Sequence, residues 1–179
     1  FILWWCSMMS VTLTGSAGTD VATMLGATVV FPGQFLTPPD LADLIETEKV
    51  TLAAGVPTLW IGVGQVMDRE PRDLSSLRAI IAGGAPVPKS LIENYEKKYG
   101  VTMVQGWGMT EMSPVGAMSH LKSYQLDLPL EQRIALRAKT GRPVPGVEVR
   151  VVDEEGVELP WDGESVGEIQ VRGPWIIGS

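Results

Sequence analysis

Short apolar runs alternate with helical patterns along much of the chain, and this alternation limits the fold more than any other feature. Runs rich in aliphatic residues lie at residues 27–31, 51–56, 77–83 and 101–105. Continuous apolar runs of this length are typical of strands buried on both faces, as parallel strands are. We therefore expect an α/β fold, with a largely parallel sheet covered by helices.

The segments between these runs carry helix signals. In TPPDLADLIETEKV, Thr37 or Asp40 can cap a helix. Pro57 suits the first position of a second helix, which we expect to extend to Met67. A third helix, KSLIENYEKKYG, is expected to stop at Gly100, since glycine commonly ends helices.

The pattern changes after Pro114. A further helix is expected at residues 128–139, and GRPVPG is typical of a turn. The segment VEVRVVDEEGVELPWDGESVGEIQVRG alternates as two strands around a polar excursion. We therefore divide the chain into an incomplete α/β subdomain at residues 1–140 and the start of a β-rich subdomain at residues 141–179.

Charge and composition exclude some classes of partner. The 179 residues include 14 Lys and Arg against 21 Asp and Glu, a net charge of −7, which argues against binding to nucleic acid or an anionic membrane. Cys6 is the single cysteine, so no internal disulfide can form, which fits a reducing compartment. The opening FILWWCSMMSVTL lacks a basic leader and is too short to span a bilayer, so we interpret it as a buried strand rather than a targeting segment.

Two glycine-containing loops follow neighbouring strands: AGGAP after the run that begins at residue 77, and GWGMTE after residues 101–105. Ligands of parallel sheets bind beyond the carboxyl ends of the strands, and glycine lets the backbone approach a ligand closely. Trp107 offers a flat face for a base, Thr110 a hydroxyl for a phosphate oxygen, and Glu111 a hard oxygen ligand for Mg²⁺. Together these residues could hold a nucleoside triphosphate and its metal ion.

Each of these features also has an ordinary structural explanation. A Gly83-Gly84 pair is common in turns, a tryptophan near a strand end is commonly core, and Thr110 before Glu111 can cap a helix. Their order at the ends of two successive strands favours a nucleotide site, and the α/β subdomain is accordingly interpreted as nucleotide-binding.

QGWGMTEMSP resembles the adenylate-forming superfamily of AMP-binding enzymes, in its acyl-CoA synthetase branch. IIAGGAPVP resembles the adenine loop of that family, and AKTGRPVPGVEVRVVD and GESVGEIQVRGPWIIGS resemble downstream segments in the expected order. The resemblance is nearly continuous over residues 26–179 and is greatest to bacterial CoA ligases for medium- or long-chain fatty acids. It implies the fold of the large N-terminal domain of an adenylate-forming enzyme.

The resemblance also implies a two-step reaction. A carboxylate attacks the α-phosphate of ATP, which releases pyrophosphate and leaves an acyl-adenylate; the thiol of coenzyme A then attacks the activated carbonyl. ATP, Mg²⁺, coenzyme A and a fatty acid are the implied small molecules, with no nucleic acid and no transmembrane segment. A cytoplasmic location is implied by the need for ATP and coenzyme A, and a homodimer of the full-length enzyme is compatible with the resemblance.

Roles can be assigned where positions match the family pattern. The residues expected around the adenosine are Gly83, Gly84, Ala85, Pro86, Gln105, Gly106 and Trp107. Gly108 and Met109 would border the acyl carboxylate. Thr110 would contact the AMP phosphate and Glu111 would bind Mg²⁺, so these two are the expected catalytic residues.

A further set is assigned less specifically to an acyl pocket, with helix packing as the alternative: Val56, Pro57, Thr58 and Trp60. His120, the only histidine, is expected at the surface or in loop packing rather than in catalysis. Residues 1–20 lack the aromatic-histidine pair of the family, through either divergence or a sequence error.

Several family elements are missing from the sequence. The lysine-ended phosphate loop would lie before Phe1, and the ribose-binding aspartate, the hinge and the small C-terminal domain would follow Ser179. We therefore expect the central third of an AMP-forming acid-thiol ligase, inactive by itself. The alternatives are a ligase for short-chain or sulfur-containing acids, an amino-acid adenylation domain, and a non-catalytic α/β nucleotide-binding module.

Overall fold

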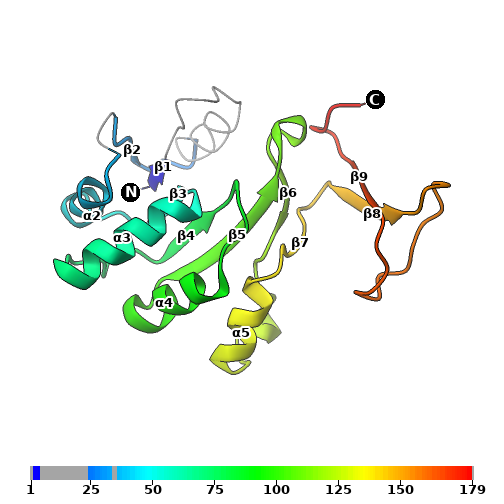
Figure 1. Ribbon diagram of the computed structural model, residues 1–179. Helices are drawn as coiled ribbons and strands as arrows, with labels where there is room; N and C mark the ends of the chain where they lie inside the picture. Colours follow the sequence, from blue (N-terminus) through cyan, green and yellow to red (C-terminus); the bar gives the residue numbers. More distant parts are fainter. Residues whose placement is uncertain (1, 5–23, 34–35, 179) are drawn as a thin grey trace.

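The computed structural model describes residues 2–4, 24–33 and 36–178. Within them, seven strands form one sheet in the order β2-β1-β3-β4-β5-β6-β7 (Figure 1). Its strands are β1 (Ile2–Trp4), β2 (Val29–Val30), β3 (Leu52–Gly55), β4 (Ala79–Ala82), β5 (Thr102–Gly108), β6 (Val115–Met118) and β7 (Arg142–Pro143). The pairs from β2 to β5 are parallel, which confirms the largely parallel α/β sheet. The pairs β5–β6 and β6–β7 are antiparallel, which the sequence patterns did not predict.

The helices begin and end close to the expected residues. They are α2 (Pro38–Thr47), α3 (Pro57–Arg69), α4 (Lys89–Tyr99) and α5 (Leu130–Arg137), with single 3₁₀ turns η1 (Thr110–Met112) and η2 (Ser123–Gln125). Thr37 is the cap of α2, because its side chain accepts a hydrogen bond from the backbone N–H of Asp40. Gly100 ends α4 in the left-handed region with φ of 66°.

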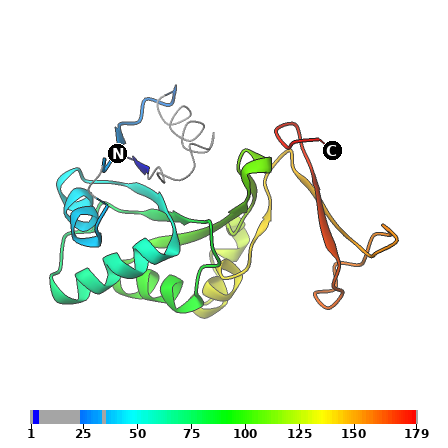
Figure 2. The same ribbon diagram turned by 45° about the horizontal axis from the view of Figure 1, so that its top comes forward.

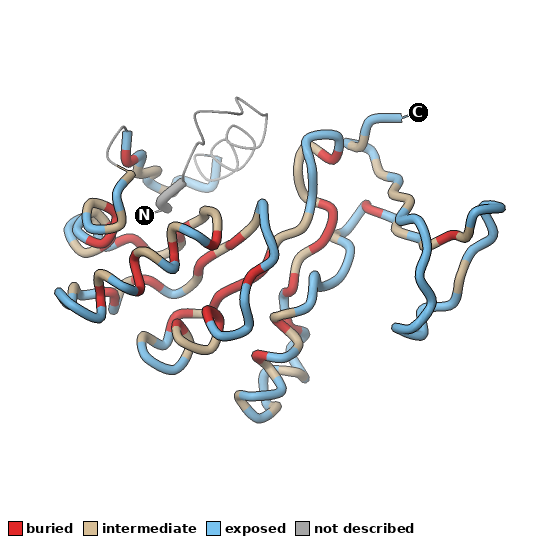
Figure 3. Tube along the Cα trace, viewed as in Figure 1, coloured by how far each residue is buried: buried red, intermediate tan, exposed pale blue. Residues whose placement is uncertain are grey.

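The core lies between the parallel strands and the helices. Figure 2 shows α3 and α4 on the same side of the sheet, and Figure 3 shows buried residues along the strands and the helix faces turned toward them. Fully buried core side chains come from both layers: Ala53, Ile80 and Met103 from the strands, and Ile45, Trp60, Ile92 and Tyr95 from the helices. Such close packing fixes the helices against the sheet. It therefore also fixes the positions of the carboxyl ends of the strands relative to one another.

Strands β8 (Glu148–Val152) and β9 (Glu168–Arg172) form a separate antiparallel hairpin, as the alternating pattern predicted (Figure 2). The prediction of a simple turn at GRPVPG was incomplete, because Arg142 and Pro143 first pair with β6 before the chain turns. Proline is compatible with such a short strand at the edge of a sheet, where its missing N–H faces no partner. For the predicted opening strand, only Ile2–Trp4 can be assessed; Cys6 and the rest of that segment lie outside the described residues.

Candidate nucleotide-binding site

The two glycine-containing segments lie side by side at the carboxyl ends of β4 and β5. Ala82, the last residue of β4, pairs with Gln105 of β5. A methyl group built on Gly83 would lie 3.1 Å from the carbonyl oxygen of Gly106, so the two backbones are nearly in contact. The paired residues Ala82 and Gln105 are 23 positions apart in the sequence, so the pairing of β4 with β5 brings two separate segments together.

The first segment, residues 83–86, presents backbone and small side chains to solvent. Gly84, Ala85 and Pro86 are exposed, and Gly84 has φ of 81°, a conformation that glycine adopts without strain. A methyl group at Gly84 would lie 3.4 Å from the side chain of Val56, which therefore sits beside this loop. A planar ligand can approach such a surface closely, since no long side chain of the described residues covers it.

Gln105 fixes this loop from below. Its side-chain oxygen accepts a 2.7 Å hydrogen bond from the backbone N–H of Val87, and both residues are buried. The backbone N–H of Gln105 donates to the hydroxyl of Ser119 at 2.8 Å, and the N–H of Ser119 donates to the carbonyl of Gln105 at 2.9 Å. The side-chain oxygen and the backbone of Gln105 are therefore both hydrogen-bonded within the protein. Ser119 supports the site through these bonds, although no sequence pattern predicted it.

The second segment differs from its expected form, because GWG is strand and not loop. β5 continues through Gly108, and β6 returns beside it with Trp107 opposite Ala117. Gly108 makes this possible: a methyl group there would lie 1.6 Å from the carbonyl oxygen of Pro114. The half-buried Trp107 ring lies against Gly116, where a built methyl group would meet the ring at 2.9 Å. Pattern reasoning missed β6, since its four residues include one glycine and one alanine and no long β-branched run.

Thr110 and Glu111 are exposed on a loop whose interior is fixed. Met112 is only 1% exposed, and its sulfur lies against Gly116 of β6. Met109 is 48% exposed, so it lies at the surface on the other side of the two predicted catalytic residues. The buried Met112 next to the exposed Thr110 and Glu111 holds the loop backbone in place, while the hydroxyl and the carboxylate remain accessible to a ligand.

The acid groups available for a metal ion are few. Among the described residues, no cluster of three or more His, Cys, Asp or Glu side chains could hold a metal ion. Glu111 therefore offers one exposed carboxylate, not a protein cage. Such a donor set fits Mg²⁺, which usually binds through one or two carboxylates, with phosphate and water oxygens as the remaining ligands.

The other candidate residues separate into surface and core. Trp60 is 1% exposed and belongs to the hydrophobic core, with its ring edge-to-face against Tyr95 at 6.4 Å, so helix packing accounts for it. Thr58 is exposed and Pro57 is buried at the start of α3. His120 is exposed, as expected, and its carbonyl accepts a 3.0 Å hydrogen bond from Arg142.

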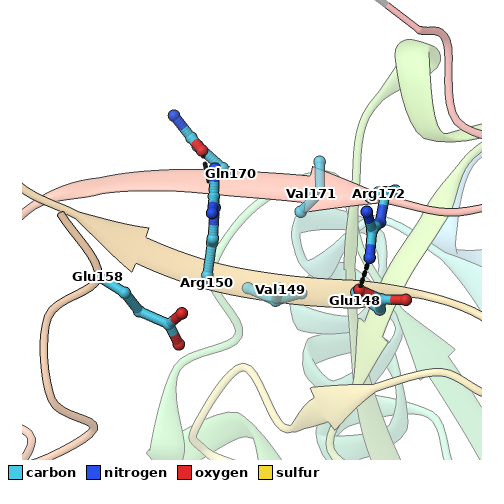
Figure 4. A pocket seen from close by; sticks show the side chains of 7 residues that line it. All are labelled: Glu148, Val149, Arg150, Glu158, Gln170, Val171 and Arg172. Atoms are coloured by element: carbon cyan, nitrogen blue, oxygen red, sulfur yellow. Dashed lines mark hydrogen bonds and ion pairs between the residues drawn. The ribbon is translucent and has the colours of Figure 1, made fainter. Parts of the chain in front are cut away.

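A cavity of about 460 Å³ lies on the β8–β9 hairpin, and none of its lining residues belongs to the candidate site. Figure 4 shows them: Glu148, Val149, Arg150, Glu158, Gln170, Val171 and Arg172. Arg172 pairs with Glu148 at 2.5 Å, and Arg150 donates to the Gln170 side chain at 2.9 Å. These polar groups are satisfied by one another, so the cavity gives no specific indication of a ligand.

Known proteins resemble this chain over most of its length. Residues 2–178 match the family model described as AMP-binding enzyme. The chain is 44% identical to a long-chain-fatty-acid–CoA ligase of Thermus thermophilus, over 88% of this chain and 29% of that protein. It is 43% identical to a 3-methylmercaptopropionyl-CoA ligase of Ruegeria lacuscaerulensis, over 87% of this chain and 29% of that protein.

Solved structures agree at the level of the fold. The crystal structure of a long-chain-fatty-acid-CoA ligase from Archaeoglobus fulgidus superimposes with a TM-score of 0.77 at 26% identity, over 98% of this chain and 34% of that one. The chain thus spans about 30% of the length of the curated relatives it matches. Within the described part of the chain, no helix is long and apolar enough to cross a membrane. On the family match and the fold together, the chain belongs to the AMP-binding enzyme family.

Proposed function

We propose that this chain is the central segment of an AMP-forming acyl-CoA ligase, which activates a medium- or long-chain fatty acid as its acyl-adenylate and transfers it to coenzyme A. The observation that carries the proposal is the contact between the Gly83 loop and the Gly106 backbone at adjacent carboxyl strand ends. Ligands of open α/β sheets bind at such edges. The 44% identity to a long-chain-fatty-acid–CoA ligase supports the substrate class.

The first step joins two anions, so it depends on charge neutralisation and alignment more than on proton transfer. In the proposed complex, the adenine lies beside the point where Gly83 meets Gly106, with Gly84–Pro86 on one side of it and Trp107 on the other. The exposed Thr110 hydroxyl donates to the α-phosphate, and the Glu111 carboxylate holds Mg²⁺. The ion supplies neutralisation of phosphate charge when it is bound. Gly108 and Met109 border the carboxylate that attacks.

The remaining assignments follow from this proposal. ATP and coenzyme A are substrates, and the location is the cytoplasm, where both are available. Residues 1–140 form the nucleotide-binding part, and residues 141–179 begin a β-rich subdomain. A homodimer of the full-length enzyme is compatible with the proposal.

The best-supported alternative is a ligase for a short or sulfur-containing acid. The 43% identity to a 3-methylmercaptopropionyl-CoA ligase is nearly as high as that to the fatty-acid enzyme. Assaying the full-length enzyme with octanoate, palmitate and 3-methylmercaptopropionate separates the two. A kcat/KM highest for 3-methylmercaptopropionate would contradict the fatty-acid assignment.

The site itself is tested by Glu111→Gln in the full-length enzyme. Removing the charge weakens Mg²⁺ binding, so carboxylate-dependent exchange of pyrophosphate into ATP should fall by about 10- to 100-fold and need more Mg²⁺. Glu154→Gln is the control, since Glu154 is exposed in the β8–β9 excursion. If Glu111→Gln keeps the normal rate and Mg²⁺ dependence, Glu111 has no part in the mechanism.

A further inference from the structure

The segment after β9 returns to the loop that carries Thr110 and Glu111. Figures 1 and 2 both show the C-terminal segment reaching the loop between β5 and β6. We call residues 173–178 the strap. The backbone N–H of Ile177 in the strap donates a 2.9 Å hydrogen bond to the carbonyl of Glu111. A distant part of the chain thus holds the residue proposed to bind Mg²⁺.

Trp175 seats the strap. A methyl group built on Gly146 would lie 3.0 and 3.1 Å from two atoms of the Trp175 ring, so the indole packs directly on the Gly146 backbone. The indole N–H also lies 3.5 Å from the carbonyl oxygen of Val115, the first residue of β6. Trp175 is 38% exposed, so much of its ring is covered in this seat.

The strap has a fixed internal shape. The N–H of Ile176 donates to the carbonyl of Gly173 at 3.1 Å, which closes a turn. A methyl group at Gly173 would lie 2.9 Å from the carbonyl oxygen of Gly146. The strap therefore contacts the turn before β8 at two of its residues, Gly173 and Trp175, before Ile177 reaches Glu111.

The loop that carries Thr110 and Glu111 is consequently held both from within and by the strap. Its two ends meet where Gly108 contacts Pro114, and Met112 fills its interior. The strap adds a contact at the Glu111 carbonyl. Within the loop, the N–H of the peptide that joins Glu111 to Met112 donates to the Met109 carbonyl at 3.0 Å, and the strap holds the carbonyl of the same peptide from outside the loop.

We propose that Trp175 is a positioning residue, which seats the strap so that Ile177 fixes the Glu111 peptide and aims its carboxylate at the metal site. The inference rests on the proposed function, because it assigns that role to Glu111. The physical reason is preorganisation: a ligand held by an outer hydrogen-bonded partner binds a metal without first ordering its own backbone.

The test uses the full-length enzyme with Trp175→Ala, Trp175→Phe and the control Trp161→Ala, since Trp161 is 67% exposed in the β8–β9 excursion. Trp175→Ala should raise the Mg²⁺ concentration for half-maximal pyrophosphate exchange about 10-fold, the usual effect of losing an outer partner of a metal ligand. Trp175→Phe keeps a ring on Gly146 and should remain within about 2-fold of the wild type, because the 3.5 Å indole hydrogen bond is weak. Trp161→Ala should change nothing.

A second measurement needs neither metal nor catalysis. In the ligand-free enzyme, amide hydrogen exchange of peptides covering residues 109–114 and 173–178 should become faster in Trp175→Ala and stay unchanged in Trp161→Ala. If Trp175→Ala does not fold, Ile177→Pro decides, since it removes the N–H donor to Glu111 and leaves Trp175 in place. It should show the same rise in Mg²⁺ requirement.

An unchanged Mg²⁺ requirement in a folded Trp175→Ala enzyme, or in Ile177→Pro, overturns the role of the strap. The role of the strap is also overturned if Trp175→Phe needs as much additional Mg²⁺ as Trp175→Ala does. Packing of an aromatic ring on Gly146 would then not explain the defect. These failures differ from failure of the proposed function. In that case Glu111→Gln itself leaves Mg²⁺ dependence unchanged.

Discussion

Gly108 is the position where the candidate site depends most directly on the absence of a side chain. Its Cα faces the Pro114 backbone, and an added methyl group would lie 1.6 Å from the carbonyl oxygen and 2.7 Å from the carbonyl carbon. No rotation of a side chain can relieve such an overlap, because both atoms belong to the backbone. Strands β5 and β6 would have to separate at the point where the loop that carries Thr110 and Glu111 begins.

Gly108→Ala should therefore destabilise the full-length enzyme by about 3 kcal/mol or more, at the upper end of overpacking effects. Gly106→Ala is the matched control in the same strand, since its methyl group would meet only the Ile81 side chain at an ordinary 3.8 Å. Denaturant unfolding followed by tryptophan fluorescence measures both. Equal stabilities of the two variants would show that the close approach at Gly108 is not maintained.

The residues proposed to contact a ligand are easier to predict from the sequence than the residues that support them. Gly84, Thr110 and Glu111 stand in short patterns whose chemistry is local, so the sequence alone identified them as candidates. The hydrogen bonds of Gln105 to Val87 and Ser119 join residues 18 and 14 positions away, and only the pairing of whole strands brings them together. No local pattern encodes such a contact.

At the scale of helices and strands, the difference between local patterns and long-range contacts explains which strands the sequence predicts. Strands β3 and β4 and helices α2 to α4 follow from local periodicity and from caps such as Thr37 and Gly100. Strands β6 and β7 do not, because their short sequences VGAM and RP have no strand periodicity, and β6 pairs only with the part of β5 that extends to Gly108. β6 therefore depends on β5, and β7 depends in turn on β6.

Helices α4 and α5 are joined by a buried ion pair. Arg137 of α5 contacts Glu96 of α4, and each side chain is 6% exposed. Removing one partner leaves the other charge buried without compensation, which is costly. The pair Lys97–Glu93 on the same helix is exposed at 48% and 42%, and water already solvates both of its charges.

Glu96→Gln should therefore lower the free energy of unfolding by about 3 kcal/mol, because the buried Arg137 charge loses its counter-charge. Glu93→Gln on the same helix should leave stability almost unchanged. Replacing both partners, in Glu96→Leu/Arg137→Leu, should recover much of the loss, since no charge then remains buried. A double variant less stable than Glu96→Gln would contradict this account of the pair.

Tyr95 links α4 to α3 and is expected to make the stability of the fold depend on pH in the alkaline range. Its hydroxyl donates to the Trp60 carbonyl at 2.7 Å, and burial, with a smaller effect of Tyr99, raises the pKa of Tyr95 well above its usual value. In the unfolded chain a tyrosine ionises near pH 10. The folded state keeps Tyr95 neutral there, so its contribution to stability is complete below about pH 10 and is lost as pH rises further.

Tyr95→Phe should lower stability at pH 7 by about 1 kcal/mol, through the lost hydrogen bond, and should reduce the further loss between about pH 9 and 11. Tyr124→Phe is the control, because Tyr124 is 65% exposed. Unfolding curves collected across this pH range measure both effects. If wild type and Tyr95→Phe lose the same stability above pH 10, the buried hydroxyl is not the cause of the alkaline dependence.

At the scale of the whole molecule, the described residues leave apolar surfaces only partly covered. In β4, Ile80 and Ala82 are buried, whereas Ala79 and Ile81 on the opposite face are only half-buried. One face of the β8–β9 hairpin carries only aliphatic side chains, namely Val149, Val151, Ile169 and Val171, and Ile169 is 55% exposed. Strands of a parallel sheet are normally covered on both faces, and a two-stranded hairpin is marginal without packing.

A protein as long as the relatives can cover these surfaces. The chain spans about 30% of each of the two curated relatives compared above, so a protein of their length has further chain available to cover both faces. The sequence patterns anticipated a sheet covered by helices because the runs were uniformly apolar. They could not say which residues provide the second covering layer.

The 179-residue segment by itself should therefore unfold over a broad temperature range and aggregate on heating, because its uncovered faces associate once they move. It should also show no carboxylate-dependent pyrophosphate exchange. Residues 83–86 and 106–111 are expected to form only one part of the site that adenylation needs. Calorimetry with repeated scans and the exchange assay measure the two properties, with the full-length enzyme as the control. A sharp, reversible transition in the segment would mean that its exposed faces need no cover, and measurable exchange would mean that its own residues suffice for adenylation.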